Sequence, residues 1–135
     1  MSREELLVAL RRDLDDLDRY AREVTGERFE RDRDVQNMVL FAVYRVQQDL
    51  VDLCNLLIVE RGLEQAGSYR DGVRRLAEAG LLTTELSVAI EGWIGLRNLV
   101  AHAYRRLDLD TVFEAVRTER QCLRDFQQVV QVLLA

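Results

Sequence analysis

The apolar stretch VQNMVLFAVYRVQQDLVDLCNLLI, residues 35–58, has the pattern of a long helix. Its apolar residues recur every three or four positions, which is the spacing of one face of an α-helix. Phe41, Val43 and Val51 widen this face, so the helix is apolar on more than one side. Such a helix usually contacts two neighbours, and the second neighbour can be another chain. We expect the helix to run to about Arg61, with Gly62 as its C-cap.

A second amphipathic helix is expected before this stretch, from Ser2 to about Val24. Ser2 and Glu5 have the spacing of a capping box, and Gly26 is expected to end the helix. The charged residues at positions 11–19, between the apolar ones, are interpreted as a solvated face. Residues 27–34 are expected to form a charged connection to the helix that follows.

Three more helices are expected after Gly62: a short one, a longer one that carries Trp93 and extends toward Tyr104, and a last one. Gly80 ends the short helix, and residues 107–111 interrupt the chain before the last helix. The expected N-caps are, in chain order, Ser68, Thr83 or Thr84, and Asp108 or Asp110. No alternating strand pattern is present. The sequence therefore predicts an all-α, antiparallel bundle of four long helices and one short helix, in one domain over residues 1–135.

Composition limits the function classes. Hydrophobic residues make up 48% and charged residues 32% of the chain, as in a folded globular domain. No apolar run approaches the ~18 residues that a membrane span needs, and no signal-peptide core is present. We therefore expect a cytoplasmic protein without a membrane contact. The absence of proline and the small number of glycines, 7, favour long helices.

The charge and the cysteine content limit the binding partners and the kinds of site that we expect. All 19 basic residues are arginine, yet the net charge is −5, so a general attraction to nucleic acid is absent. Any RNA binding must come from a local basic patch. Cys54 and Cys122 both lie in apolar helical patterns and are expected to be free and buried, without a disulfide. No metal and no cofactor are predicted.

Polar residues cluster in the segment GLRNLVAHAY, residues 95–104, which holds the single histidine of the chain. On one straight helix Arg97 and Tyr104, seven residues apart, share a face. His102 lies about 140° around the axis from Arg97, so the two side chains do not meet automatically. Three arrangements remain open: the helix loosens near Ala103, the long arginine wraps around it, or the two groups face counterparts from a second subunit.

These residues suit RNA cleavage without a metal. The 2′-hydroxyl must lose a proton as it attacks its own phosphate, and a histidine with a near-neutral pKa is suited to that transfer. The Arg97 guanidinium can stabilise charge that develops on the phosphorane oxygens. A symmetric dimer would bring two His102 side chains to one cleft. Arg105 and Arg106, just beyond, are candidate contacts for flanking phosphates.

Other interpretations stay open on the residues alone. A lone histidine near a helix end is more often a structural group or a cap, and adjacent arginines such as Arg105 and Arg106 are usually a solvated face. The cleft could hold a nucleotide or a protein partner and cut nothing. The bundle could also be a purely structural oligomer, although burying Arg97, Asn98 and His102 together would then be costly.

The run RNLVAHAY, residues 97–104, resembles the R-x4-H-x-Y signature of the HEPN superfamily and, more narrowly, the HepT-like toxins. The SYRD turn at residues 68–71, the Gly80 step into the motif helix and Asp108 before the final helix match as well. Two positions depart from the family pattern. Gly67 stands where proline is frequent, and Leu96 stands where phenylalanine is frequent.

The resemblance implies the toxin of a two-gene toxin–antitoxin module: an endoribonuclease that acts on tRNA or mRNA as a homodimer. In it Arg97 and His102 are catalytic, and Asn98 is a supporting polar neighbour. The implied partner is an MNT-type nucleotidyltransferase antitoxin, which transfers AMP from ATP to Tyr104 and so neutralises the toxin. The alternative is a non-catalytic HEPN module that holds a nucleotide or a nucleotidyltransferase.

Overall fold

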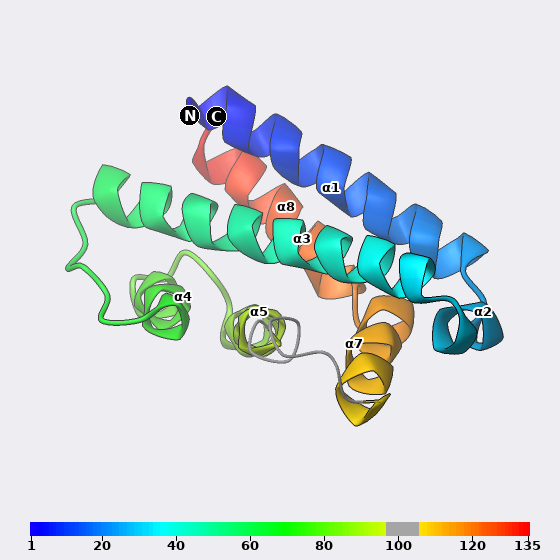
Figure 1. The fold of residues 1–135 in the computed structure, drawn as a ribbon. Helices are drawn as coiled ribbons and strands as arrows, with labels where there is room; N and C mark the ends of the chain where they lie inside the picture. Colours follow the sequence, from blue (N-terminus) through cyan, green and yellow to red (C-terminus); the bar gives the residue numbers. More distant parts are fainter. Residues whose placement is uncertain (97–105) are drawn as a thin grey trace.

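The structure is a computed structural model that describes residues 1–96 and 106–135. In these ranges seven helices form, shown in Figure 1. Their bounds are α1 (Arg3–Glu23), α2 (Gly26–Arg31), α3 (Arg33–Glu60), α4 (Tyr69–Glu78), α5 (Thr84–Gly95), α7 (Arg106–Thr118) and α8 (Gln121–Leu133). The predicted all-helical bundle is confirmed, with more and shorter helices than expected. None of the described helices is long and apolar enough to cross a bilayer.

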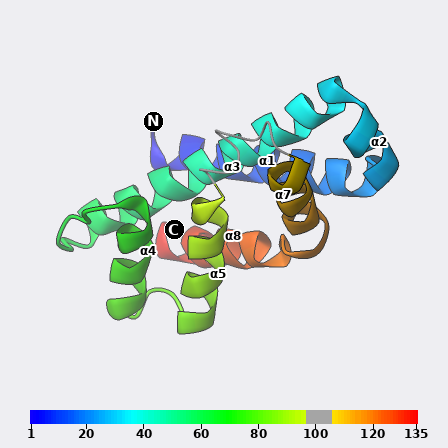
Figure 2. The same ribbon diagram turned by 60° about the horizontal axis from the view of Figure 1, so that its bottom comes forward.

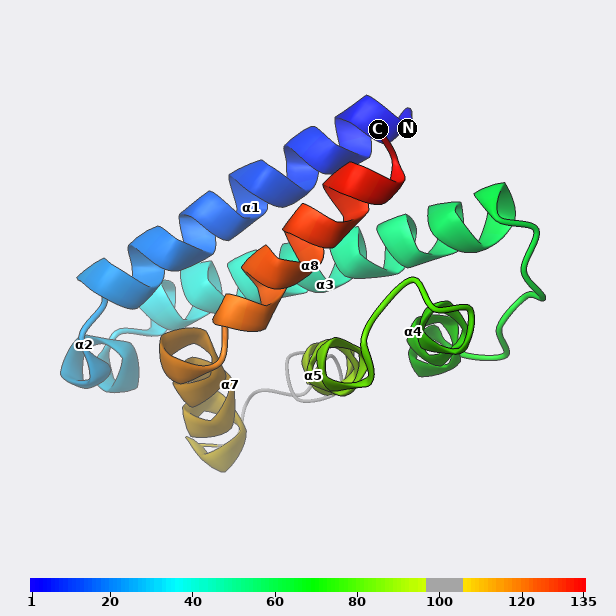
Figure 3. The same ribbon diagram turned by 180° about the vertical axis from the view of Figure 1, so that it is seen from behind.

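Helix α3 is the centre of the arrangement, with more neighbours than the two that its apolar pattern predicts. It packs against α1, α2, α4, α5 and α7. α1 lies antiparallel to α3, and α8 lies beside them with its end next to the start of α1 (Figures 1 and 3). The three helices α4, α5 and α7 run across the direction of α3, and Figures 1 and 3 show α4 and α5 end-on and α7 obliquely.

The hydrophobic core is built around α3 and holds one aromatic stack. The fully buried residues of α1 and α3 include Leu10, Leu17, Val39, Val43, Val46, Leu50, Leu53 and Leu57. Phe29 of α2 stacks on Phe113 of α7, with ring centroids 4.3 Å apart. This stack is where α2 is held against the bundle, because Phe29 is the buried residue of that helix.

Several predicted helix ends are confirmed. The side-chain oxygens of Ser2, Ser68 and Thr83 each accept a hydrogen bond, at 3.1 Å, from the backbone N–H three residues on. Gly62 and Gly80 follow α3 and α4 with φ of 64° and 78°. In this left-handed region a glycine has no Cβ penalty, which explains why the two helices end there.

The charged connection before α3 was predicted wrongly, because it contains helix α2. Thr25 caps this helix by accepting from the N–H of Arg28 at 3.1 Å. Gly26 is therefore the first residue of α2 and does not end α1, whose last residue is Glu23. A helix of 6 residues with one buried side chain, Phe29, shows no periodicity that a sequence pattern could reveal.

The break before the last helix also lies elsewhere. Residues 107–111 are helical within α7, so Asp108 and Asp110 do not cap the last helix. The chain turns instead at residues 119–120, between α7 and α8, which point in different directions (Figure 2). Val116 and Leu123 are seven residues apart, about two helical turns. The apolar residues therefore keep helical spacing across the turn, so the sequence pattern does not reveal it.

Not all of the charged face of α1 is solvated. Asp13 was assigned to that face, yet it is only 3% exposed, because it lies between α1 and α3. Its Oδ1 accepts from the Nε of Arg12 at 3.2 Å and lies 3.5 Å from the Nε of Arg45. Asp49 of α3 is buried nearby, at 8% exposed. A pair of buried carboxyl groups thus lies within the main helix interface.

Candidate functional site

The motif residues Arg97, Asn98, His102, Tyr104 and Arg105 lie outside the residues that the structure describes. Arg106 is the first residue of α7, but its side chain lies outside them too. The structure does describe the two helices that flank the motif segment in the chain. Helix α5 ends at Gly95, two residues before Arg97, and α7 begins directly after the segment 97–105.

Trp93 binds the last turn of α5 to two other parts of the molecule. Its carbonyl oxygen accepts from the Nε2 of Gln47, on α3, at 2.8 Å. Its indole Nε1 donates to the carbonyl oxygen of Glu119, in the turn between α7 and α8, at 2.9 Å. Trp93 is only 2% exposed. Trp93 is therefore a core residue, and these two hydrogen bonds also give it a positioning role for α5.

Gln47 is a buried polar residue that the apolar pattern of α3 did not indicate. It is 0% exposed, and among the residues that the structure describes its Oε1 has no hydrogen-bond partner. An unpaired buried acceptor costs about 1–3 kcal/mol. The amide of Gln47 therefore holds the carbonyl of Trp93 although its own oxygen stays unsatisfied.

An arginine of α4, Arg70, lies beside the end of α5. The Arg70 guanidinium lies against Gly95: a Cβ built on this glycine would be 3.0 Å from Cζ and 3.3 Å from Nε of Arg70. Because Gly95 has no side chain, another group can approach the helix closely here, and in the structure that group is the Arg70 side chain. Sequence reasoning did not identify Arg70 as a site residue. Its only signal was its place in the SYRD turn at residues 68–71.

An apolar hollow of about 420 Å³ lies on another side of the same helix end. Its lining residues are Ala89, Gly92, Trp93, Leu96, Glu119, Gln121 and Cys122. Burial raises the pKa of the Cys122 thiol, which lies 3.4 Å from the carbonyl oxygen of Glu119. The pKa of Cys54 is raised by burial to about 12. Both cysteines are free, Cys54 is buried and Cys122 is half-buried, so neither is a ready thiolate nucleophile at neutral pH.

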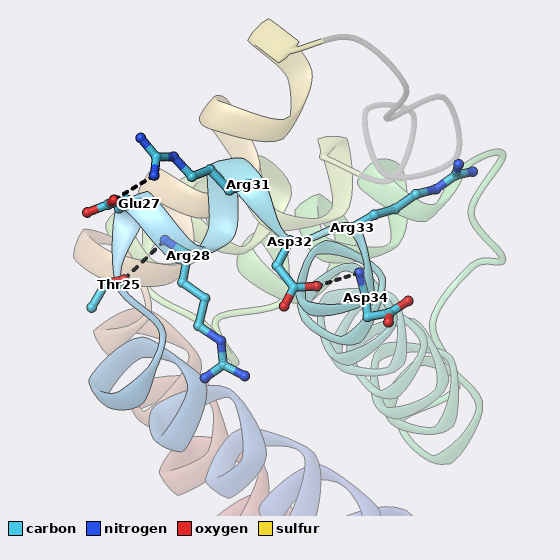
Figure 4. A pocket seen from close by; sticks show the side chains of 7 residues that line it. All are labelled: Thr25, Glu27, Arg28, Arg31, Asp32, Arg33 and Asp34. Atoms are coloured by element: carbon cyan, nitrogen blue, oxygen red, sulfur yellow. Dashed lines mark hydrogen bonds and ion pairs between the residues drawn. The ribbon is translucent and has the colours of Figure 1, made fainter.

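A larger hollow, of about 500 Å³, lies where α2 meets α3 (Figure 4). It is lined by Thr25, Glu27, Arg28, Arg31, Asp32, Arg33 and Asp34. The Nη1 of Arg31 pairs with Glu27 at 3.0 Å, and Asp32 caps α3 by accepting from the N–H of Asp34 at 3.0 Å. Its arginines and carboxylates are equal in number, and several already hold structural roles. This hollow is therefore not a strong anion site.

Comparison with known proteins identifies the family. The family model described as Ribonuclease HepT-like matches residues 10–130. This chain belongs to that family. The mRNA nuclease HepT of Shewanella oneidensis is 32% identical to this HepT-like chain over 110 residues, which are 82% of this chain and 80% of that relative.

Solved structures agree with the assignment. The HEPN toxin of Shewanella oneidensis, tri-AMPylated and in complex with the MNT antitoxin, has a TM-score of 0.86 and 25% identity. The match covers 98% of this HepT-like chain and 99% of that toxin. YutE of Bacillus subtilis, a cytosolic protein of unknown function, shows the same fold with a TM-score of 0.82 at 16% identity, over 98% of this chain and 90% of YutE.

The family assignment confirms the predicted class of activity. As a HepT-like ribonuclease the chain is an RNA endonuclease, and the predicted resemblance to ribonuclease toxins of toxin–antitoxin modules is confirmed at the level of the family. The roles expected for Arg97, Asn98, His102, Tyr104, Arg105 and Arg106 remain predictions.

Proposed function

We propose that this HepT-like chain is a metal-independent endoribonuclease toxin that cleaves mRNA or tRNA as a homodimer. The observation that carries the proposal is the complete Arg97, His102 and Tyr104 set within a chain of this family. The relative that is named an mRNA nuclease supports RNA as the substrate. The anchored end of α5 supports a fixed entry into the motif, since Trp93 is bound to both α3 and the α7–α8 turn.

The cleavage step requires one group that takes a proton and one that gives it. His102 of one subunit removes the proton of the 2′-hydroxyl, whose oxygen attacks the adjacent phosphorus. The bond between phosphorus and the 5′-oxygen breaks, and the second His102 protonates that leaving oxygen. Arg97 stabilises the charge on the phosphorane oxygens, with Asn98 as a supporting neighbour. Arg105 and Arg106 hold the flanking phosphates.

The homodimer is proposed because each chain supplies one histidine and the mechanism uses two. An exposed aromatic on the central helix supports it: Phe41 of α3 is 59% exposed. The guanidinium of Arg45 lies over this ring, with its Cζ 5.4 Å from the ring centroid. A contiguous exposed apolar patch marks an association surface, and Phe41 would contribute its ring to such a patch on α3. We propose that α3 and the motif segment form the two-fold interface.

Regulation is proposed to occur at Tyr104. An MNT-type nucleotidyltransferase would transfer AMP to the phenol oxygen, with pyrophosphate leaving from ATP. The added phosphate carries negative charge, and it would compete with RNA for Arg97. The support is the related HEPN toxin that was solved in a tri-AMPylated form with its MNT antitoxin.

Two measurements test the proposal. Cleavage of mRNA and tRNA by the purified protein should be lost in His102→Ala, and a variant that still cleaves at the wild-type rate would contradict the catalytic role. Intact-mass analysis after co-expression with an MNT-type nucleotidyltransferase should show a gain of AMP units on Tyr104. Protein that binds the nucleotidyltransferase but never cuts RNA would identify the non-catalytic binding module instead.

A further inference from the structure

Arginines dominate a hollow of about 360 Å³ where the end of α1, the end of α7 and the start of α8 come together (Figure 3). Its lining residues are Asp18, Arg22, Arg117, Thr118, Arg120, Gln121 and Arg124. Four arginines thus face one carboxylate, although the whole chain has a net charge of −5. A chain of this charge has no general attraction to RNA and needs a local basic site to bind it. This hollow has the surplus of positive charge that the hollow between α2 and α3 lacks.

Two of these arginines are held in place by Asp18 of α1. Its Oδ1 accepts from the Nε of Arg120 at 2.8 Å, and its Oδ2 accepts from the Nη2 of Arg124 at 2.7 Å. Arg124 is also paired with Asp15, at 2.6 Å. The Nη1 of Arg120 donates to two carbonyl oxygens of the last turn of α7, at 3.0 and 3.1 Å, whereas its Nη2 forms no hydrogen bond to the described residues. Arg120 therefore has two N–H donors left on a fixed guanidinium, which can bind an anion with little loss of side-chain entropy.

The other two arginines carry the surplus charge. The Cζ of Arg117 lies 5.8 Å from the centroid of the Phe113 ring, within the range of a cation–π contact, and that ring stacks on Phe29. Arg22 is exposed in the last turn of α1. Within residues 1–96 and 106–135, neither arginine side chain forms a hydrogen bond or an ion pair. No side chain caps α8, whose first residue lines the hollow, so the N–H groups of its first turn add partial positive charge there.

We propose that this hollow binds phosphate groups in the backbone of the RNA substrate, at a distance from the motif segment. An arginine fork can donate two parallel hydrogen bonds to one phosphate. This inference rests on the proposed ribonuclease function, which supplies RNA as the ligand. Helix α7 starts directly after the motif segment, and its 13 residues span about 20 Å, at ~1.5 Å per residue. The hollow at the far end of α7 therefore contacts RNA beyond the position of cleavage.

The test measures RNA binding without cleavage, in the full chain carrying His102→Ala. Affinity for a fluorescein-labelled single-stranded RNA is measured by anisotropy at several salt concentrations. Adding Arg22→Ala/Arg117→Ala should weaken binding about tenfold, as expected for lost charge-assisted contacts. It should also reduce the slope of log affinity against log salt by about 0.7 to 1.4, because each lost phosphate contact on a single strand contributes about 0.7. Arg22→Lys/Arg117→Lys should restore the slope but only part of the affinity, since lysine keeps the charge without the fork.

Arg11→Ala/Arg61→Ala is the matched control, because it removes the same charge from two exposed positions outside the hollow. Arg11 lies on the same side of α1 as Arg22, about three turns earlier, and Arg61 directly follows α3. The RNA affinity of this control should stay within about twofold of the parent protein, because salt screens distant charges. Urea unfolding should give the same midpoint for both alanine double variants, since neither breaks an ion pair among the described residues. An equal loss of RNA affinity in the control would show a general effect of charge and would overturn the inference.

A free nucleotide or pyrophosphate offers the same phosphate chemistry as RNA, and titration calorimetry with pyrophosphate separates the two sources. Pyrophosphate should bind much more weakly than RNA. Tight binding of pyrophosphate that depends on Arg22 and Arg117, together with unchanged RNA affinity in their alanine variant, would overturn the assignment to RNA. Unchanged RNA affinity alone would also overturn it, while the proposed function would stand if cleavage still requires His102. If the wild-type protein neither binds nor cuts RNA, both fail.

Discussion

The amide nitrogen of Gln47 donates to the carbonyl oxygen of Trp93 at 2.8 Å, and this bond joins the central helix to the helix that leads into the motif. Both residues are buried. A rigid entry into a catalytic segment matters because small misplacements of reacting groups lower the rate strongly. The Gln47–Trp93 contact is therefore expected to affect both stability and cleavage.

Replacing Gln47 by leucine should test this contact. The change leaves the Trp93 carbonyl without the Gln47 donor but also removes the unpaired Oε1, so the free energy of unfolding should fall by less than about 1 kcal/mol. RNA cleavage should fall as well, even under conditions where the variant is fully folded. Urea unfolding and an RNA cleavage assay measure the two effects. Gln128→Leu, at an exposed position of α8, is the control, and an equal response of both variants would refute the assigned role.

Trp93→Phe should separate the indole hydrogen bond from the apolar packing. Phenylalanine keeps most of the buried ring but cannot donate to the Glu119 carbonyl. We expect a loss of about 1–2 kcal/mol in the free energy of unfolding, together with faster amide exchange in the α7–α8 turn. Unchanged exchange in that turn would show that the indole does not hold it.

The carboxyl pair between α1 and α3 should make stability depend on pH. Burial, and then the neighbouring Asp13, raise the pKa of Asp49 to about 8. In the unfolded chain the pKa of an aspartate is about 3.9, so between these values the folded state holds a proton that the unfolded state has released. The free energy of unfolding should therefore fall as the pH rises from about 4 to 8.

Asp49→Asn removes this titration. Urea unfolding is measured at pH 5 and 7, within the range of about 4 to 8, and at pH 9, above it. The free energy of unfolding should change less with pH in the variant than in the wild type. The variant should be more stable than the wild type at pH 9, because its neutral amide does not repel Asp13. Asp110→Asn, at an exposed position of α7, should leave the profile unchanged. A variant that is less stable than the wild type at pH 9 would contradict the assigned protonation.

A second carboxylate should act in the opposite direction. Burial works to raise the pKa of Asp18, but hydrogen bonds from Arg124 and Arg120 outweigh it and hold the pKa below its ordinary value. The ion pairs, at 2.7 Å to Arg124 and 2.8 Å to Arg120, join α1 to α8 and to the turn before it. Their contribution is present at neutral pH and is lost as the pH falls below about 4. Asp18→Asn should lower the free energy of unfolding by about 1 kcal/mol at pH 7 and should weaken the acid dependence measured by urea unfolding.

Phe41→Ser should weaken the proposed homodimer, because it removes an exposed aromatic ring from α3. Light scattering at micromolar concentration should shift toward the monomer, and RNA cleavage should fall with it. Val88→Ser, at another exposed apolar position, is the control. A wild-type protein that is a monomer at this concentration would remove the mechanism that uses two histidines.

The sequence predicted those features that depend on neighbouring residues. The capping residues Ser2, Ser68 and Thr83 and the terminating glycines Gly62 and Gly80 act within one turn, so their spacing was enough. The turn at residues 119–120 was missed because the buried stripe stays in phase across it. The burial of Asp13 was missed because it depends on α3, which is distant in sequence.

The residues of the candidate site also fall into those that the sequence could predict and those that it could not. The motif residues were identified because they are close together in the chain and resemble a family signature. Gln47 and Arg70 meet the motif helix only through tertiary contacts of α3 and α4 with α5. No sequence spacing connects these positions, since the intervening loops set which turns of the helices face each other.

The start of α1 and the end of α8 lie at one corner of the molecule (Figure 1), where Arg3 donates to the carbonyl oxygen of Leu134 at 3.1 Å. A short flexible linker could therefore join the two termini without disturbing the helices. New ends could then be opened in the connection at residues 62–67, which lies between α3 and α4. Circular permutants of this kind keep the same core with a different chain order. A fluorescent label attached to one of the new ends would lie at the base of α4, close to Arg70.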